Sequence, residues 1–184
     1  MTQYPVMLTV EGRRCLVVGG GKIAARKVDG LVGAGADVTV IAPRVDASIT
    51  ALPVTVEQRP YRPGDADGGF RLVITATDDP DVNAQVYAEA EAAEVWVNSA
   101  DDPEHCSFTL PAIHRDGDVT VAIGTGGQSP AFAAWLRDRV RESLPAGLSD
   151  VVDRLAAERR SVHDAGKSTE ARDWRPRIEQ LVAA

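Results

Sequence analysis

Residues 14–24 decide the fold of this chain, and they read Arg14-Cys15-Leu16-Val17-Val18-Gly19-Gly20-Gly21-Lys22-Ile23-Ala24. The first part is a continuous apolar run that ends in glycine, which is typical of a parallel strand buried on both faces. A helical pattern follows over Lys22–Ala34, and it puts Ile23, Lys27, Leu31 and Ala34 near one face. A strand, a glycine turn and a helix in this order predict the start of a parallel α/β sheet.

Strand and helix patterns continue to alternate up to about residue 100. A loop with two prolines and three glycines, Pro60–Gly69, interrupts them. Strands are predicted at Asp37–Ile41, Val54–Gln58, Phe70–Thr75 and Val95–Asn98, and a helix at Asp81–Ala93. The predicted fold class is therefore α/β with a Rossmann-like parallel sheet, which we assign to residues 1–112.

The pattern changes in the second part of the chain. Two β-like runs, Ser107–Ile113 and Asp118–Ile123, flank an Asp-Gly pair, which favours a hairpin. Ser129 and Pro130 predict the start of a helix that runs to about Leu144. Later helices are expected at Leu148–His163 and Asp173–Val182, with a polar stretch, Asp164–Ala171, between them.

We therefore expect two further regions, a hairpin-plus-helix region over residues 113–147 and a small C-terminal helical region over 148–184. One hairpin and one long helix are too few elements to enclose a core. The first of these regions is predicted to pack against a second copy of itself, which makes it a dimerisation region.

The glycine turn is also the clearest candidate binding site, because Gly19 to Ala24 fits the pattern G-x-G-x-x-A between a strand and a helix. Gly19 allows the tight turn, Gly21 lets the backbone approach a pyrophosphate, and Ala24 lets helix and strand pack closely. The free N–H groups of the helix would face the phosphates. The alternative is a purely structural turn.

Two strand ends add candidate residues. The second strand lacks the usual ribose-binding acid, because Ile41-Ala42-Pro43-Arg44 stands there, and Arg44 is either tolerant of a 2′-phosphate or a solvated surface residue. Past the fifth strand, a carboxylate of Asp101 or Asp102 would lie at the ligand-binding edge and could relay a proton. The alternative is that these aspartates only form a turn before Pro103.

Composition narrows the class of protein. The chain has 184 residues, a net charge of -7 at pH 7 and only 5% aromatic residues, which argues against nucleic-acid binding. No stretch approaches the roughly 20 apolar residues that span a membrane, and no secretory signal is visible. We expect a cytoplasmic protein with Cys15 and Cys106 reduced. His105, Cys106 and His114 do not form a metal-ligand pattern, so no bound metal is expected.

Several short stretches together resemble one family. They are Tyr4-Pro5-Val6, the strand and helix entry from Cys15 to Lys27, Leu72 to Asp79, Val97-Asn98 with Asp101-x-Pro103, Cys106 to Ala112, and Thr125 to Ala131. In this order, over residues 1 to about 145, they resemble the precorrin-2 dehydrogenases and the N-terminal part of the sirohaem synthases.

This resemblance implies an NAD-dependent oxidation of precorrin-2 to sirohydrochlorin in sirohaem biosynthesis, which in some members is followed by insertion of Fe2+. It implies that Asp101 is catalytic and that Asp102 is its solvated neighbour. It also implies a homodimer in which the region after residue 112 is exchanged between subunits.

The resemblance further assigns residues to ligands. It implies that the nucleotide contacts Lys22, Ile23, Pro43 and Arg44, and that Thr77 lies near the nicotinamide. Asn98, Thr125 and Ser129 are then expected to bind the tetrapyrrole, and some of Arg115, Arg137, Arg139 and Arg141 to face its carboxylates. The alternatives are a non-catalytic nucleotide-sensing domain, which would need neither Asp101-x-Pro103 nor the Thr125–Pro130 loop, and a chelatase without dehydrogenase activity.

Overall fold

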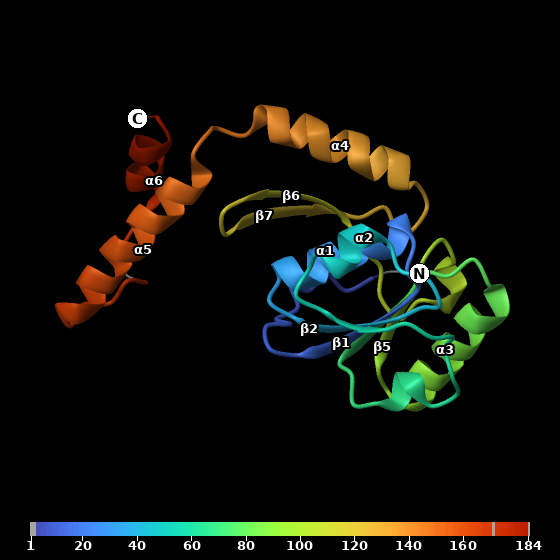
Figure 1. The fold of residues 1–184 in the computed structure, drawn as a ribbon. Helices are drawn as coiled ribbons and strands as arrows, with labels where there is room; N and C mark the ends of the chain where they lie inside the picture. Colours follow the sequence, from blue (N-terminus) through green and yellow to red (C-terminus); the bar gives the residue numbers. More distant parts are fainter. Residues whose placement is uncertain (1–2, 171, 184) are drawn as a thin grey trace. The chain divides into compact units, whose positions relative to one another are not determined.

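A computed structural model describes residues 3–170 and 172–183 (Figure 1). They form two compact units, one up to Thr109 and one from Leu110 onward. This division lies close to the boundary predicted at residue 112, whereas the boundary predicted at 147 stays a prediction. Ala171, the last residue of the predicted polar stretch, lies outside the described residues.

A five-stranded parallel sheet forms the centre of the first unit, with the strand order β3-β2-β1-β4-β5. Its strands are β1 (Arg14–Val18), β2 (Asp37–Ile41), β3 (Thr55–Glu57), β4 (Leu72–Thr75) and β5 (Trp96–Ser99). The strand order reverses between β1 and β4, and ligands of open α/β sheets bind beyond the carboxyl ends of the strands at such a point. The predicted Rossmann-like fold class is confirmed.

Helices cover both faces of this sheet. They are α1 (Lys22–Gly33), α2 (Ala47–Thr50) and α3 (Pro80–Ala92), with short 3₁₀ turns η1 (Asp65–Asp67) and η2 (Pro103–His105). The start of α3 is fixed locally, because the Asp79 side chain accepts hydrogen bonds from the N–H groups of Asp81 and Val82. Pro80 suits the first helical position because it has no N–H to satisfy.

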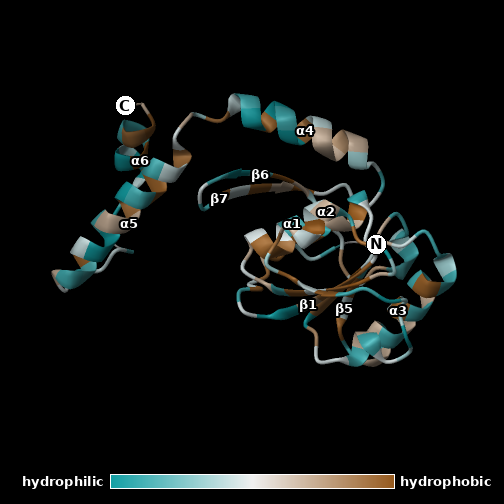
Figure 2. Ribbon diagram, viewed as in Figure 1, coloured by the Kyte–Doolittle hydropathy of each residue, from teal (hydrophilic) through white to brown (hydrophobic). Residues whose placement is uncertain are grey.

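The core forms on both faces of β1, as its continuous apolar run predicted. Val17 packs in one cluster with Val28 of α1, and Leu16 packs in the other cluster with Val86 of α3. All four side chains are fully buried, and Figure 2 shows the apolar character of the central strands. On α1, Ala24 is buried in the core, whereas Ile23 is 39% exposed.

The second unit is a hairpin followed by three helices. Its elements are β6 (Ala112–Asp116), β7 (Val119–Ile123), α4 (Pro130–Ser143), α5 (Leu148–Asp164) and α6 (Arg175–Val182). Gly117, with φ 56°, takes the first position of the two-residue turn between antiparallel β6 and β7. The Ser129 hydroxyl caps α4 by accepting a hydrogen bond from the Phe132 N–H, as the sequence predicted.

The hairpin begins later than predicted. The N–H of Ser107 donates to the Val97 carbonyl at 2.9 Å, and Cys106 forms a bridge with Asn98. The backbone from residue 106 therefore continues along the edge of β5, and β6 starts only after Pro111.

The second unit buries very little. Of its described residues, only Ala133 and Leu181 are buried apolar side chains, whereas Phe132 and Trp135 are 52% and 56% exposed. Figure 2 shows that α4 is apolar at its beginning and hydrophilic toward its end. Within the described ranges, no helix is both long and apolar enough to cross a bilayer.

Candidate active site

The glycine turn after β1 holds three strand ends together. Gly19 has φ 126°, and a Cβ there would lie 2.3 Å from the Ala76 carbonyl oxygen. Its N–H donates to the Ile41 carbonyl at 3.0 Å, and the Ala76 N–H donates to the Val18 carbonyl at 2.8 Å. Only glycine fits this conformation and this close approach, so Gly19 is required by the fold itself.

Gly20 has a role that the sequence pattern did not reveal. A Cβ at Gly20 would lie 2.0 Å from the Arg44 carbonyl oxygen, and the Gly20 carbonyl accepts a hydrogen bond from the Asp46 N–H at 2.8 Å. The glycine turn therefore packs directly on the segment after β2. This contact joins the predicted nucleotide residues Pro43 and Arg44, both exposed, to the glycine turn.

Gly21 is different, because nothing lies within 4 Å of the position of its Cβ. It precedes α1, whose first turn has no side-chain cap. The N–H groups at the start of a helix lack partners within the helix and attract phosphate. An open approach beside uncapped N–H groups fits a pyrophosphate, and the exposed Lys22 and Ile23 begin the same helix.

The segment after β2 contains one acidic residue that the sequence analysis did not consider. Asp46 caps α2, where its carboxylate accepts hydrogen bonds from the Ser48 N–H at 2.9 Å and the Ser48 hydroxyl at 2.7 Å. These bonds lower the pKa of Asp46. The first carboxylate after β2 therefore caps α2. This agrees with the expectation that the usual ribose-binding acid is absent after this strand.

The end of β4 is rigid around the predicted nicotinamide neighbour Thr77. The Asn83 side-chain oxygen accepts hydrogen bonds from the Thr77 hydroxyl at 2.8 Å and from the Thr75 hydroxyl. The Asn83 side-chain nitrogen donates to the Thr77 carbonyl at 3.0 Å. Asn83 was not predicted as a site residue, and it fixes the turn that presents Thr77 at the carboxyl edge of the sheet.

Asp101 follows β5 at the same edge. The N–H of its neighbour Ala100 donates to the Thr75 carbonyl at 2.8 Å, which joins the turn after β5 to the end of β4. Asp101 is exposed and has φ 62°, a left-handed conformation that is uncommon for non-glycine residues and that aspartate adopts more readily than most. Residues in uncommon backbone conformations cluster at functional sites, and together with its exposed carboxylate at the carboxyl edge of the sheet this makes Asp101 the strongest candidate for chemistry there.

Asp102 was expected to be a solvated neighbour of Asp101, and its side chain also makes a contact that the sequence did not reveal. Its carboxylate is 2.6 Å from Nδ1 of His105. The hydrogen bond with the His105 ring holds the pKa of Asp102 below its usual range. The two side chains remain 41% and 40% exposed, so the pair lies at the surface of the edge.

Cys106 and Asn98 connect the end of β5 with the segment that follows η2. The Cys106 sulfur accepts a hydrogen bond from the Ser99 N–H at 3.2 Å. The buried Asn98 amide nitrogen donates to the Phe108 carbonyl at 2.9 Å and contacts the Cys106 sulfur at 3.4 Å. Burial raises the pKa of the Cys106 thiol, which suits the predicted packing role. Because these contacts engage the Asn98 amide, its role in substrate binding stays a prediction.

Lys27 is another residue that the sequence analysis did not assign to the site. Its side chain is half-buried on α1, and burial together with the nearby Arg26 lowers its pKa. The charges of Asp101 and Cys106 oppose this shift. Lys27 is therefore close enough to Asp101 to interact with it electrostatically. The one sequence feature that could have identified Lys27 as a site residue is its place at the end of the Cys15–Lys27 stretch, which belongs to the family resemblance.

The predicted tetrapyrrole residues Thr125 and Ser129 belong to the second unit. They form one compact turn, in which the Ser129 N–H donates to the Thr125 hydroxyl at 3.2 Å. Three of the arginines expected to face the substrate carboxylates pair with acidic residues of α4. The guanidinium nitrogens of Arg137, Arg139 and Arg141 lie 2.9, 3.0 and 3.7 Å from carboxylate oxygens. Their role toward a substrate stays a prediction.

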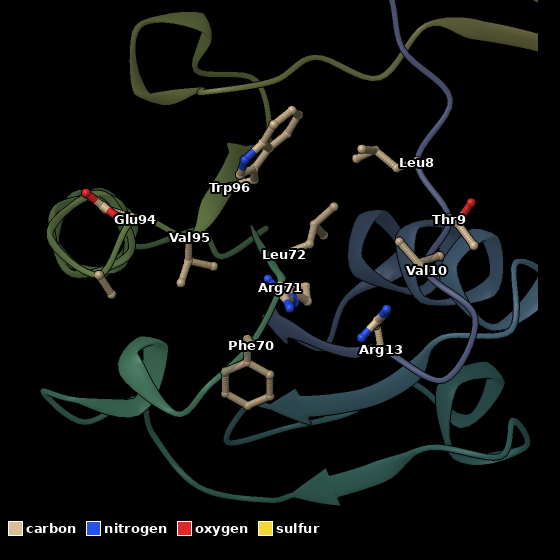
Figure 3. A pocket seen from close by; sticks show the side chains of 11 residues that line it. Leu8, Thr9, Val10, Arg13, Phe70, Arg71, Leu72, Glu94, Val95 and Trp96 are labelled. Carbon is tan, nitrogen blue, oxygen red and sulfur yellow. The ribbon is translucent and has the colours of Figure 1, made fainter.

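A cavity of about 470 Å³ lies elsewhere in the first unit (Figure 3). It is lined by Leu8, Arg13, Leu72 and Trp96 among others, next to the starts of β4 and β5. This is the amino edge of the sheet, opposite the glycine turn and Asp101. Among the described residues, no three His, Cys, Asp or Glu side chains gather to hold a metal ion.

Comparisons with known proteins agree with this geometry. A family described as "Putative NAD(P)-binding" matches residues 6–112. The chain belongs to this NAD(P)-binding family. A second family, "Sirohaem biosynthesis protein central", matches residues 116–143. The dinucleotide site predicted from the glycine pattern thus lies inside a domain of the corresponding family.

The relatives confirm the predicted resemblance. The chain is 36% identical to the siroheme synthase of Hydrogenovibrio crunogenus over 88% of its own length and 36% of that protein. It is 42% identical to that of Nitrosococcus oceani over 79% of its length and 32% of that protein. The chain thus spans about a third of these relatives. The solved structure of SirC, a precorrin-2 dehydrogenase, matches with a TM-score of 0.77 and 27% identity, over 98% of this chain and 88% of that one.

Proposed function

We propose that this protein oxidises precorrin-2 to sirohydrochlorin with NAD+ as the hydride acceptor. The observation that carries the proposal is the likeness to a precorrin-2 dehydrogenase over 98% of this chain. The carboxyl edge of the sheet supports it independently. There the open backbone at Gly21 and the strained Asp101 follow strands of one sheet whose ends are joined through Ala76 and Ala100.

The reaction removes a hydride and a proton from the substrate. The bound dinucleotide supplies the hydride acceptor. We assign the proton to the Asp101 carboxylate, which is exposed at the edge and is free to approach a substrate carbon. The rigid turn around Thr77 and Asn83 limits motion next to the nicotinamide position, so that substrate and acceptor are held in one geometry.

Incubation of the protein with precorrin-2 and NAD+ tests this function. NADH and sirohydrochlorin should form in equal amounts, followed by their absorbance. NADP+ in place of NAD+ tests the cofactor preference, because the exposed Arg44 after β2 is either a contact for a 2′-phosphate or a solvated surface residue. Absence of both NADH with NAD+ and NADPH with NADP+ would refute the proposal, and NADPH formation with no NADH would refute NAD+ as the acceptor.

Insertion of Fe2+ into sirohydrochlorin is the second candidate activity. The relatives named siroheme synthase favour it, although this chain spans only about a third of their length. Fe2+ would be a substrate here rather than a resident metal. Sirohydrochlorin with Fe2+ and no NAD+ tests the step. Sirohaem formed faster than in a protein-free control would establish it.

We also propose that the protein is a homodimer formed through the second unit and located in the cytoplasm. The support is that Phe132 and Trp135 are 52% and 56% exposed in a unit whose described residues form little buried core. Light scattering should give twice the 19.6 kDa of one chain. The non-catalytic nucleotide sensor is less favoured, because such a domain needs no strained aspartate beyond β5.

A further inference from the structure

The backbone is the main determinant of the position of Asp101. Among the described residues, its carboxylate has no hydrogen-bond or ion-pair partner, and Lys27 acts on it only through charge over a longer distance. Its backbone is left-handed at φ 62°, which is uncommon for a residue other than glycine and is retained where the surrounding structure supports it. The residues on either side of Asp101 must therefore hold the turn.

The preceding side of the turn is held by β4. The Ala100 N–H donates to the Thr75 carbonyl at 2.8 Å, and the Asp102 N–H reaches back to the Ser99 carbonyl at 3.3 Å. The second of these bonds is long, so it contributes little restraint to the residue that follows Asp101.

The following side of the turn is held by Asp102 and His105. The Asp102 carboxylate lies 2.6 Å from His105 Nδ1, and the Asp102 carbonyl accepts hydrogen bonds from the His105 N–H and the Cys106 thiol, both at 3.2 Å. The side chain and the main chain of Asp102 are thus both fixed to η2.

The His105 ring is itself fixed to the sheet domain. It packs edge-on against Tyr87 of α3, with ring centroids 4.8 Å apart and an interplanar angle of 71°. The ionised Asp102 carboxylate accepts only, so Nδ1 carries the proton of this hydrogen bond. The contacts therefore run from α3 through His105 and Asp102 to the residue next to Asp101.

We propose that Asp102 and His105 form a clamp that holds Asp101 in its left-handed conformation, and that His105 is a positioning residue for the reaction. The kinetic part of this inference rests on the proposed function. The alternative is that the pair only adds stability to the domain. A clamp predicts that loss of His105 changes the turn and the reactivity of Asp101, whereas mere stability predicts neither below the unfolding temperature.

Hydrogen exchange tests the clamp without any substrate. In the His105→Ala variant, the amides of Ala100 and Asp102 should exchange at least about tenfold faster, while the amides of the glycine turn, Gly19–Gly21, keep their rates. Asp102→Ala should give the same pattern, because the two side chains act as a pair. The control is His163→Ala, which removes an exposed histidine from α5. Unchanged exchange at Ala100 and Asp102 would overturn the proposal.

A double-mutant cycle tests the kinetic role. His105→Ala should lower kcat for precorrin-2 by about 10- to 100-fold, the scale expected for a misplaced catalytic group, with the affinity for NAD+ unchanged. In an Asp101→Ala background the same change should lower kcat less than about twofold, because His105 acts through Asp101. Equal losses in both backgrounds would overturn the positioning role.

The two arms separate the possible failures. Faster exchange together with coupled kinetics supports the proposal. Faster exchange in a protein that does not oxidise precorrin-2 supports the clamp and refutes the proposed function instead. Faster exchange with full kcat in His105→Ala shows that the clamp does not serve the reaction, which also overturns the proposal.

Discussion

The two units of this chain differ in how many apolar side chains they bury. The first encloses β1 between α1 and α3, so that Leu16 and Val17 are both fully buried. The described part of the second unit buries only Ala133 and Leu181 among its apolar side chains. The hydrophobic effect scales with the apolar area removed from water, so the first unit is stabilised by its own core and the second needs a further surface to cover it.

This difference separates the expected roles of the two units. The glycine turn, Thr77 and Asp101 are all fixed by contacts within the first unit, whereas Phe132 and Trp135 expose stacked rings in the second. Substitutions in the first unit should therefore act on the site, and those on α4 should act on assembly.

The largest effect is expected at Asp101. Asp101→Ala should lower kcat for precorrin-2 by about 10²–10⁴-fold, the usual range for loss of a general acid or base. The affinity for NAD+ should not change, because the glycine turn keeps its contacts. Steady-state kinetics and an NAD+ titration measure the two quantities. A variant with full kcat would leave substrate positioning as the only source of catalysis in this unit.

The glycine turn should separate binding from folding. Gly21→Val should weaken NAD+ binding by at least about 100-fold while the fold is retained, since its side chain enters open space where the pyrophosphate approaches. Gly20→Ala should instead destabilise the protein by about 1–3 kcal/mol, because its Cβ meets the Arg44 backbone. Titration and thermal unfolding distinguish these effects.

Gly30→Ala is the matched control on α1. It also enters open space but lies inside the helix, where alanine is favoured over glycine. It should keep its NAD+ affinity. If Gly21→Val binds NAD+ as tightly as this control does, the glycine turn is not the nucleotide site.

The exposed rings of α4 should control assembly. Trp135→Ala should weaken the dimer by about 2 kcal/mol or more, the scale of an aromatic hot spot, and leave the affinity for NAD+ unchanged. Light scattering over a range of protein concentrations measures the dimer. Arg139→Ala, on the same helix and exposed, serves as the control and should change little. Dimerisation unaffected by Trp135→Ala would place the interface elsewhere.

The smallest expected effect is on stability, and it is tested by comparing one ion pair from each unit. Arg59 and Asp65 lie 2.6 Å apart with side chains 22% and 16% exposed, whereas Arg139 and Glu142 are 64% and 56% exposed. Asp65→Asn should destabilise the protein by about 1 kcal/mol at pH 7, and Glu142→Gln by less than about 0.5 kcal/mol, because solvent screens the exposed pair.

The dependence on pH has a definite sign. The Arg59 guanidinium holds the pKa of Asp65 below its usual range, so the folded state favours the ionised carboxylate. Its contribution to stability is present above the pKa of the unfolded chain, about 3.9, and is lost as the pH falls through the lower pKa of the folded state. The difference in the free energy of unfolding between wild type and Asp65→Asn, measured with denaturant, should therefore decrease as the pH falls through this range. A constant difference would exclude this ion pair as its source.

Local patterns were sufficient for several elements of both units. The apolar run of β1 and the strand at Asp37–Ile41 in the first unit, and the cap of α4 at Ser129 in the second, were predicted because each depends on neighbouring residues. The role of Gly20 was not predictable, because it depends on Arg44, which the fold brings close. The contacts of His105 were not predicted either, since nothing local shows that η2 turns it toward Asp102 and Tyr87.

The sequence by itself determined the Rossmann-like class, the glycine turn and the family, because periodicity and short motifs are local properties of a chain. Only the tertiary structure decided which side chain supports which. It distinguished Gly21, open to a ligand, from Gly19 and Gly20, closed by backbone, and it showed that Asp102 is hydrogen-bonded to His105. The physical reason is that burial, strain and hydrogen bonding depend on distances between residues that lie far apart along the chain.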